Sequence, residues 1–107
     1  MPKPFFAYGP MTREDACREI LGRTLQGEPA RLSGYRVEKD RGYSFLVEAD
    51  GAVVDGLLFR TLQAPDYWVL DQYQNVEQGL YRRETVEVEA NGGREEAYTY
   101  LGGPTLS

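Results

Sequence analysis

The chain has 107 residues, of which 41% are hydrophobic, and a formal net charge of -5. This length fits one small domain, which we expect to span residues 1–107. The negative charge argues against binding to nucleic acid or to an anionic membrane surface, because both would repel it. The absence of histidine excludes the serine and cysteine nucleophiles that depend on a histidine base.

The first strand is expected at Phe5–Tyr8, which is rich in aromatic residues and is followed by Gly9-Pro10. Thr12 is then predicted to be the N-cap of a helix, and Gly22 its C-cap. Between them, an apolar stripe at helical spacing includes Cys17, the only cysteine. A buried, unreactive thiol is the favoured interpretation, and no disulfide can form within the chain.

Three further strands are predicted in the middle of the chain, at Ala30–Val37, Ser44–Glu48 and Val53–Phe59. Gly34 inside the first of them suggests either a bulge or a site of close approach. Asp50-Gly51 lies between the second and third and predicts a hairpin turn.

A second helix is expected to begin near Pro65, which suits a first helical turn, and to run to about Tyr73. Its buried side would be supplied by Tyr67, Trp68 and Leu70, with Tyr73 as a further candidate. These aromatic residues would pack the helix against the sheet.

The C-terminal part alternates polar and apolar residues over Glu84–Glu89, as a half-buried strand does, with its acids on the solvent-facing side. Asn91–Gly93 predicts a hairpin turn, Ala97–Leu101 the returning strand, and Gly102–Ser107 a loop. Strands outnumber helices and are joined mostly by short turns. The predicted fold class is therefore α+β, with a twisted mixed sheet that curls toward a barrel.

Targeting signals are missing from the sequence. Residues 1–4 lack the apolar run of a signal peptide, and no apolar stretch approaches the roughly 20 residues of a membrane helix. With a single cysteine, these features lead us to expect a cytoplasmic protein.

The segment Leu70-Asp71-Gln72-Tyr73-Gln74, followed by Tyr81-x-Arg83, resembles the signature of the γ-glutamylcyclotransferase-like (AIG2-like) family. Other family motifs occur in the same order over nearly the whole chain: Tyr8-Gly9-Pro10-Met11, Leu32-Ser33-Gly34-Tyr35, Val54–Phe59 and Ala97–Tyr100. The resemblance implies a small twisted mixed β-barrel flanked by helices, with a pocket at one end.

The resemblance also implies a ligand class and a reaction. The ligands are γ-glutamyl amines or related amino-acid amides. The α-amine of the substrate attacks its own γ-carbonyl carbon, closes a ring and releases 5-oxoproline, while a glutamate acts as general acid and base. No metal or organic cofactor is implied.

The position of the family's catalytic glutamate is occupied here by Gln74, whose carboxamide cannot accept a proton near neutral pH. The resemblance places the substrate-binding contacts in the first loop, at Tyr8, Gly9, Pro10 and Met11. Tyr81 or Tyr100 would add a contact from the later strands. Pro10 departs from the family's usual hydroxyl residue and has no N–H to donate.

Three explanations for Gln74 remain open at this stage. The chain could be an inactive family member that binds and senses a ligand, or an enzyme in which Asp71 or Glu77 transfers the proton. The glutamate could also have been replaced deliberately to trap a ligand. A different class of function, a protein-interaction module that keeps the fold without the pocket, is the rival. The oligomeric state is not determined by the sequence.

Overall fold

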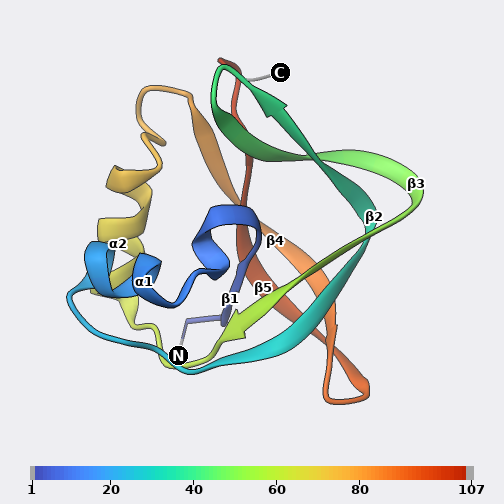
Figure 1. The fold of residues 1–107 in the computed structure, drawn as a ribbon, viewed down its shortest axis with the longest axis horizontal. Coiled ribbons are helices and arrows are strands. Elements are labelled where there is room, and N and C mark those ends of the chain that lie inside the picture. The colour runs from blue at the N-terminus through green and yellow to red at the C-terminus, as the bar shows by residue number, and fades with distance from the viewer. Residues whose placement is uncertain (1, 106–107) are drawn as a thin grey trace.

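The computed structural model describes residues 2–105, without the side chain of Glu14. The elements follow in the order β1 (Phe5–Ala7), the 3-10 helix η1 (Gly9–Thr12), α1 (Glu14–Leu21), β2 (Gly27–Asp40), β3 (Tyr43–Phe59), α2 (Ala64–Tyr73), β4 (Tyr81–Ala90) and β5 (Gly93–Gly102). The strands close into a barrel in the order β1-β3-β2-β4-β5. Figure 1 shows α1 and α2 together on one side of this barrel. The predicted helix-flanked β-barrel is confirmed.

The sheet is mixed. β5 runs parallel to β1 and to one part of β3, whereas the other strand pairs are antiparallel. β2 and β4 meet at a single pair, Arg31 with Glu89, which closes the barrel. The loop predicted from Gly102 onward begins one residue later, at the end of β5, and its last two residues lie outside the described part of the chain.

The predicted hairpin turn at Asp50-Gly51 is wrong. The hairpin between β2 and β3 turns at Arg41-Gly42, whose φ angles of 53° and 84° are those of a type I′ turn. β3 then continues through Asp50 and Gly51 as one strand. Because segments 43–48 and 53–59 both pair with β2, a second turn between them is not needed.

The segment that contains Asp50-Gly51 is a bulge in β3. Ser33 pairs with Val53 and Tyr35 with Glu48, so that Gly34 alone faces residues 49–52 of β3. The irregularity predicted at Gly34 is therefore present, although the extra residues belong to its partner strand.

The start of α1 also differs from the prediction. Arg13, not Thr12, occupies the N-cap position, and Thr12 belongs to the preceding η1, where its hydroxyl donates to the Gly9 carbonyl at 2.6 Å. Pro10 lies in the first turn of this separate 3-10 helix, which includes Thr12 and ends before α1 starts. Gly22 is the C-cap as predicted, with a φ of 78°.

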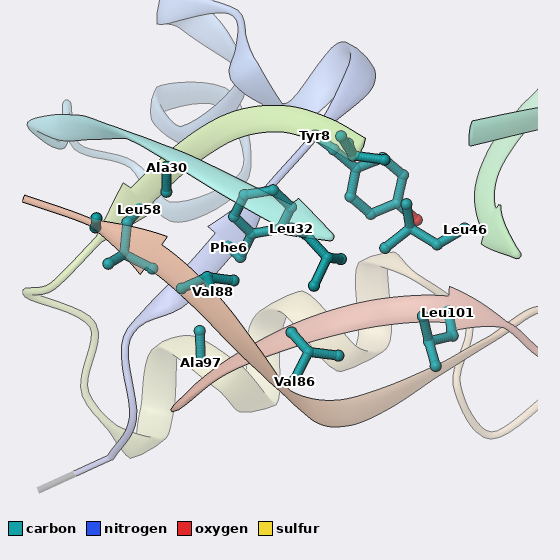
Figure 2. Packing of buried hydrophobic residues seen from close by; sticks show 12 residues of the cluster. Phe6, Tyr8, Ala30, Leu32, Leu46, Leu58, Val86, Val88, Ala97 and Leu101 are labelled. Atoms are coloured by element: carbon teal, nitrogen blue, oxygen red, sulfur yellow. The ribbon is translucent and has the colours of Figure 1, made fainter. Parts of the chain in front are cut away.

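The core has two layers, because adjacent residues of β1 point to opposite sides of the barrel wall. Phe6 points into the barrel, where Leu32, Leu58 and Val88 also pack (Figure 2). Phe5 points toward the helices and packs in a second cluster with Cys17, Tyr67, Leu70 and Tyr100. Cys17 is buried as predicted, and this burial raises the pKa of its thiol.

α2 packs on the barrel through one narrow face. Tyr67 and Leu70 are buried as predicted, since residues three apart share a helix face. The expected burial of Trp68 and Tyr73 is wrong, because these side chains are 64% and 58% exposed.

In β4, Glu84, Glu87 and Glu89 are all exposed as predicted, while Val86 and Val88 are buried in the core. Glu87 and Glu89 share the face opposite the two valines. Within residues 2–105, no cluster of His, Cys, Asp and Glu side chains has a geometry that could hold a metal ion. No helix in this part of the chain is long and apolar enough to cross a membrane.

Candidate functional site

A cavity of about 350 Å³ lies between η1, the start of β3 and the end of α2. This volume is in the range of small-molecule binding sites. The described residues that line it are uncharged: Pro10, Met11, Tyr43, Ser44, Tyr73, Gln74, Asn75, Leu80 and Tyr81. Segments from four separate elements thus meet at one hollow, which makes it a candidate site.

Gln74 is the most unusual residue of this cavity. It caps the C-terminus of α2, where its backbone N–H donates to the Leu70 carbonyl at 2.9 Å. The residue is only 9% exposed, yet its side-chain amide has no hydrogen-bond partner among the described residues. Buried amides normally have such partners, so this group is available to a ligand or to water in the cavity.

The turn after β1 forms another wall of the cavity. Pro10 and Met11 line the cavity, and Gly9, with a φ of 59°, lies against the start of β3. A Cβ added to Gly9 would be 3.7 Å from the Cβ of Ser44. Glycine is suited to this position because its φ is positive and other residues would be strained there.

Tyr81 completes the wall contributed by β4. Its hydroxyl donates to the Ser44 carbonyl at 2.6 Å, and its ring meets that of Tyr43 edge-on, with 6.4 Å between centroids. Burial raises the pKa of the Tyr81 hydroxyl, so this group keeps its proton at neutral pH. The Tyr81 hydroxyl therefore fixes the wall and has no free proton to donate to a ligand.

Three of the predicted site residues, Tyr8, Gly9 and Tyr100, are not among the residues that line the cavity. Tyr8 points into the barrel beside Leu46 (Figure 2), and its hydroxyl donates to the Tyr100 carbonyl at 2.5 Å. Burial holds the pKa of the Tyr8 hydroxyl well above its usual value. Tyr100 is 2% exposed, and its hydroxyl donates to Asp71 Oδ1 at 2.7 Å. The cavity thus brings together Pro10, Met11, Gln74 and Tyr81, whereas Tyr8 and Tyr100 support the surrounding structure.

Asp71 and Arg83 link α2 to the barrel. Arg83 Nε lies 3.2 Å from Asp71 Oδ1, and the guanidinium of Arg83 stacks over the rings of Tyr67 and Tyr98 at 4.8 and 4.7 Å. Asp71 also accepts the hydrogen bond from Tyr100. These contacts give both residues a structural role.

Replacing Asp71 with alanine is expected to lower the free energy of unfolding by about 1–3 kcal/mol, because the buried Tyr100 hydroxyl would lose its acceptor. Urea unfolding measures this change. Adding Tyr100→Phe to the same variant removes the unpaired hydroxyl, and we expect part of the stability to return. Equal losses with and without Tyr100→Phe would contradict this role.

Sequence reasoning did not identify Tyr43, Ser44 and Tyr73 as residues of the cavity. Tyr43 and Ser44 reach it because the hairpin turn is at Arg41-Gly42, which places the start of β3 near the end of α2. The only feature of the sequence that could have revealed this placement was the turn at Arg41-Gly42. Tyr73 was assigned to the buried face of its helix, but it lies at the cavity with 58% of its surface exposed.

The β2–β4 side of the barrel has a larger hollow of about 540 Å³, next to the turn at Asn91-Gly92. Its charged residues include Arg31 and Asp55, which pair with each other at 3.2 Å and are both exposed. The cavity at Gln74 is the stronger candidate, because its lining includes a side-chain amide that has no hydrogen-bond partner among the described residues.

Residues 5–106 match the protein family described as "Gamma-glutamyl cyclotransferase, AIG2-like". The chain belongs to this family. The γ-glutamylcyclotransferase-like fold also occurs in a solved structure titled "Gamma-glutamyl cyclotransferase", which is 19% identical, with a TM-score of 0.82 over 94% of this chain and 66% of that one.

Two other proteins are more similar to this chain in sequence than that structure is. The solution structure of At3g28950.1 from Arabidopsis thaliana is 28% identical, with a TM-score of 0.75 over 94% of this chain and 61% of that one. A Methanocaldococcus jannaschii protein, named a gamma-glutamylcyclotransferase and putative RNase, is 24% identical over 90% of this chain. The match covers only 44% of that archaeal protein, so this chain corresponds to less than half of it.

Proposed function

We propose that this chain binds γ-glutamyl amines or related amino-acid amides in the cavity at Gln74 and that it has little cyclotransferase activity of its own. The observation that carries the proposal is the Gln74 amide, which is 9% exposed, lines a cavity and has no partner among the described residues. Family membership supports the ligand class. The same residue argues against efficient turnover.

Cyclisation needs a proton acceptor near the attacking amine. The amine nitrogen forms a bond to the γ-carbonyl carbon and loses a proton, and the bond from that carbon to the departing amine breaks as the departing amine takes up a proton. Gln74 cannot transfer these protons, and loss of a general base typically lowers a rate by about 10²–10⁴-fold.

Neither nearby carboxylate is placed to replace the missing base. Asp71 is held by Tyr100 and Arg83, and Glu77 is exposed and faces a different hollow, beside Trp68. No carboxylate is found among the described residues that line the cavity. These placements favour a binding protein over an enzyme with a relocated base.

Calorimetric titration with a series of γ-glutamyl amines tests the proposal, together with an assay of 5-oxoproline release from the same compounds. We expect saturable binding of at least one compound and very slow release of 5-oxoproline. The proposal fails if no compound in the series binds. Rapid release that Glu77→Gln abolishes would instead identify Glu77 as a substitute base and contradict the expected low activity.

A further inference from the structure

We propose that Gln74 makes the cavity selective for a lactam or an unsubstituted carboxamide over an open-chain secondary amide. This inference rests on the proposed function and names the part of the ligand that Gln74 recognises. It is based on the Gln74 amide, which has no partner among the described residues although the residue is only 9% exposed, and on the uncharged lining of the cavity.

A carboxamide side chain carries a donor and an acceptor next to each other. At Gln74, neither group has a partner within the part of the chain that the structure describes. A lactam presents its N–H and C=O on the same side, because the ring holds the amide cis, and an unsubstituted carboxamide does the same. Either group can form two hydrogen bonds with Gln74 at once. An open-chain secondary amide is trans, with N–H and C=O pointing in opposite directions, so it can form only one.

Charged ligand groups satisfy only half of the Gln74 amide. A carboxylate accepts from its NH₂ and an ammonium donates to its oxygen, and in each case the other half stays unpaired. The described lining residues also carry no charge that would balance an ion at this point. A neutral group with a donor and an acceptor side by side is therefore the best match.

The hydroxyl of Tyr81, which also lines the cavity, cannot supply the same selectivity. The Tyr81 hydroxyl already donates to the Ser44 carbonyl at 2.6 Å. Pro10, on the facing wall, has no N–H. Asn75 carries the other carboxamide of the lining but is exposed, so we assign the discrimination between amide geometries to Gln74.

A lactam and the matching lactone test this inference. 5-Oxoproline and 5-oxotetrahydrofuran-2-carboxylate have similar shape and the same charge, but the lactone has a ring oxygen in place of the N–H. We expect calorimetry to show about tenfold tighter binding of the lactam by the unmodified chain, because one hydrogen bond is lost with the lactone. Equal affinity for the two compounds would overturn the inference.

The variant Gln74→Met is the matched control, since it keeps an unbranched side chain of similar size without the amide. We expect its lactam and lactone affinities to agree within about twofold. A tenfold preference that persists in this variant would assign the selectivity to another residue. Near-ultraviolet circular dichroism checks that the variant keeps the native packing.

L-Glutamine and its γ-N-ethyl amide extend the test to open-chain ligands and separate the two proposals. We expect glutamine to bind more tightly to the unmodified chain, and this advantage to shrink in Gln74→Met. If the N-ethyl amide binds at least as well as glutamine to the unmodified chain, the inference fails while the proposed function stands. If none of the four compounds and no γ-glutamyl amine binds, both fail.

Discussion

The substitution Gln74→Glu is expected to raise the rate of 5-oxoproline release from γ-glutamyl amines by about 10²–10⁴-fold. Glutamate has nearly the same size and shape as glutamine, so it should fit the cavity without repacking. The substitution supplies the proton acceptor that the carboxamide lacks.

The surroundings of position 74 should also help the new carboxylate to act as a base. The position is 9% exposed, and its described neighbours in the cavity are uncharged. Burial without a nearby positive charge raises the pKa of a carboxyl group, which moves it closer to neutral pH, where a general acid–base catalyst is most effective. We expect activity to rise with pH through this elevated pKa, since the deprotonated form accepts the proton.

Steady-state assays of 5-oxoproline release measure this gain. Gln72→Glu is the matched control, because it makes the same chemical change on an exposed residue of α2 outside the cavity. We expect no gain from it. If Gln74→Glu folds, binds the substrates and still releases no 5-oxoproline, then the cavity does not hold the substrate amine near position 74.

Replacing Gly56 with alanine is expected to lower the free energy of unfolding by about 3 kcal/mol or more. Gly56 lies in β3 where β1 crosses closely, and a Cβ there would be 2.2 Å from the Ala7 carbonyl oxygen and 2.8 Å from Phe6 Cζ. The first of these atoms belongs to the backbone and cannot move without disturbing the pairing of β1. This loss is large for a small domain.

Urea unfolding measures the effect as a shift in the midpoint at an unchanged slope. Gly93→Ala provides the control, because Gly93 is also a strand glycine, and the nearest atom to its added Cβ is 3.9 Å away. We expect this control to change stability by less than about 1 kcal/mol. Similar losses of stability in the two variants would show that the close contact at position 56 does not cause the destabilisation.

Turns illustrate how far local sequence could predict the fold. Asn91-Gly92 adopts φ angles of 54° and 76° in the hairpin between β4 and β5, as that residue pair predicts on its own. Asp50-Gly51 carries an equally strong local signal, yet it lies within β3. The turn at Arg41-Gly42 prevails because it lets both halves of β3 pair with β2, an advantage that involves residues far apart in the chain.

The tyrosines illustrate the same limit at the candidate site. The sequence pattern placed Tyr73 on the buried face of its helix and Tyr100 at the ligand site, but Tyr73 is 58% exposed at the cavity and Tyr100 is 2% exposed beside Asp71. Periodicity assigned Tyr67 and Leu70 correctly because they share one helix face. The last turn of α2 faces η1 and β3, and their positions depend on how the barrel closes.

The order of the motifs is enough to identify the family, and the residue type at position 74 fixes its chemistry, because a carboxamide accepts no proton near neutral pH. The placement of Gln74, which is 9% exposed, unpartnered within the described chain and in one cavity with Tyr43 and Ser44, depends on the three-dimensional fold. Burial and hydrogen bonding depend on which distant segments meet. Here that follows from the register of β2 with β3 and from the packing of α2 on the barrel.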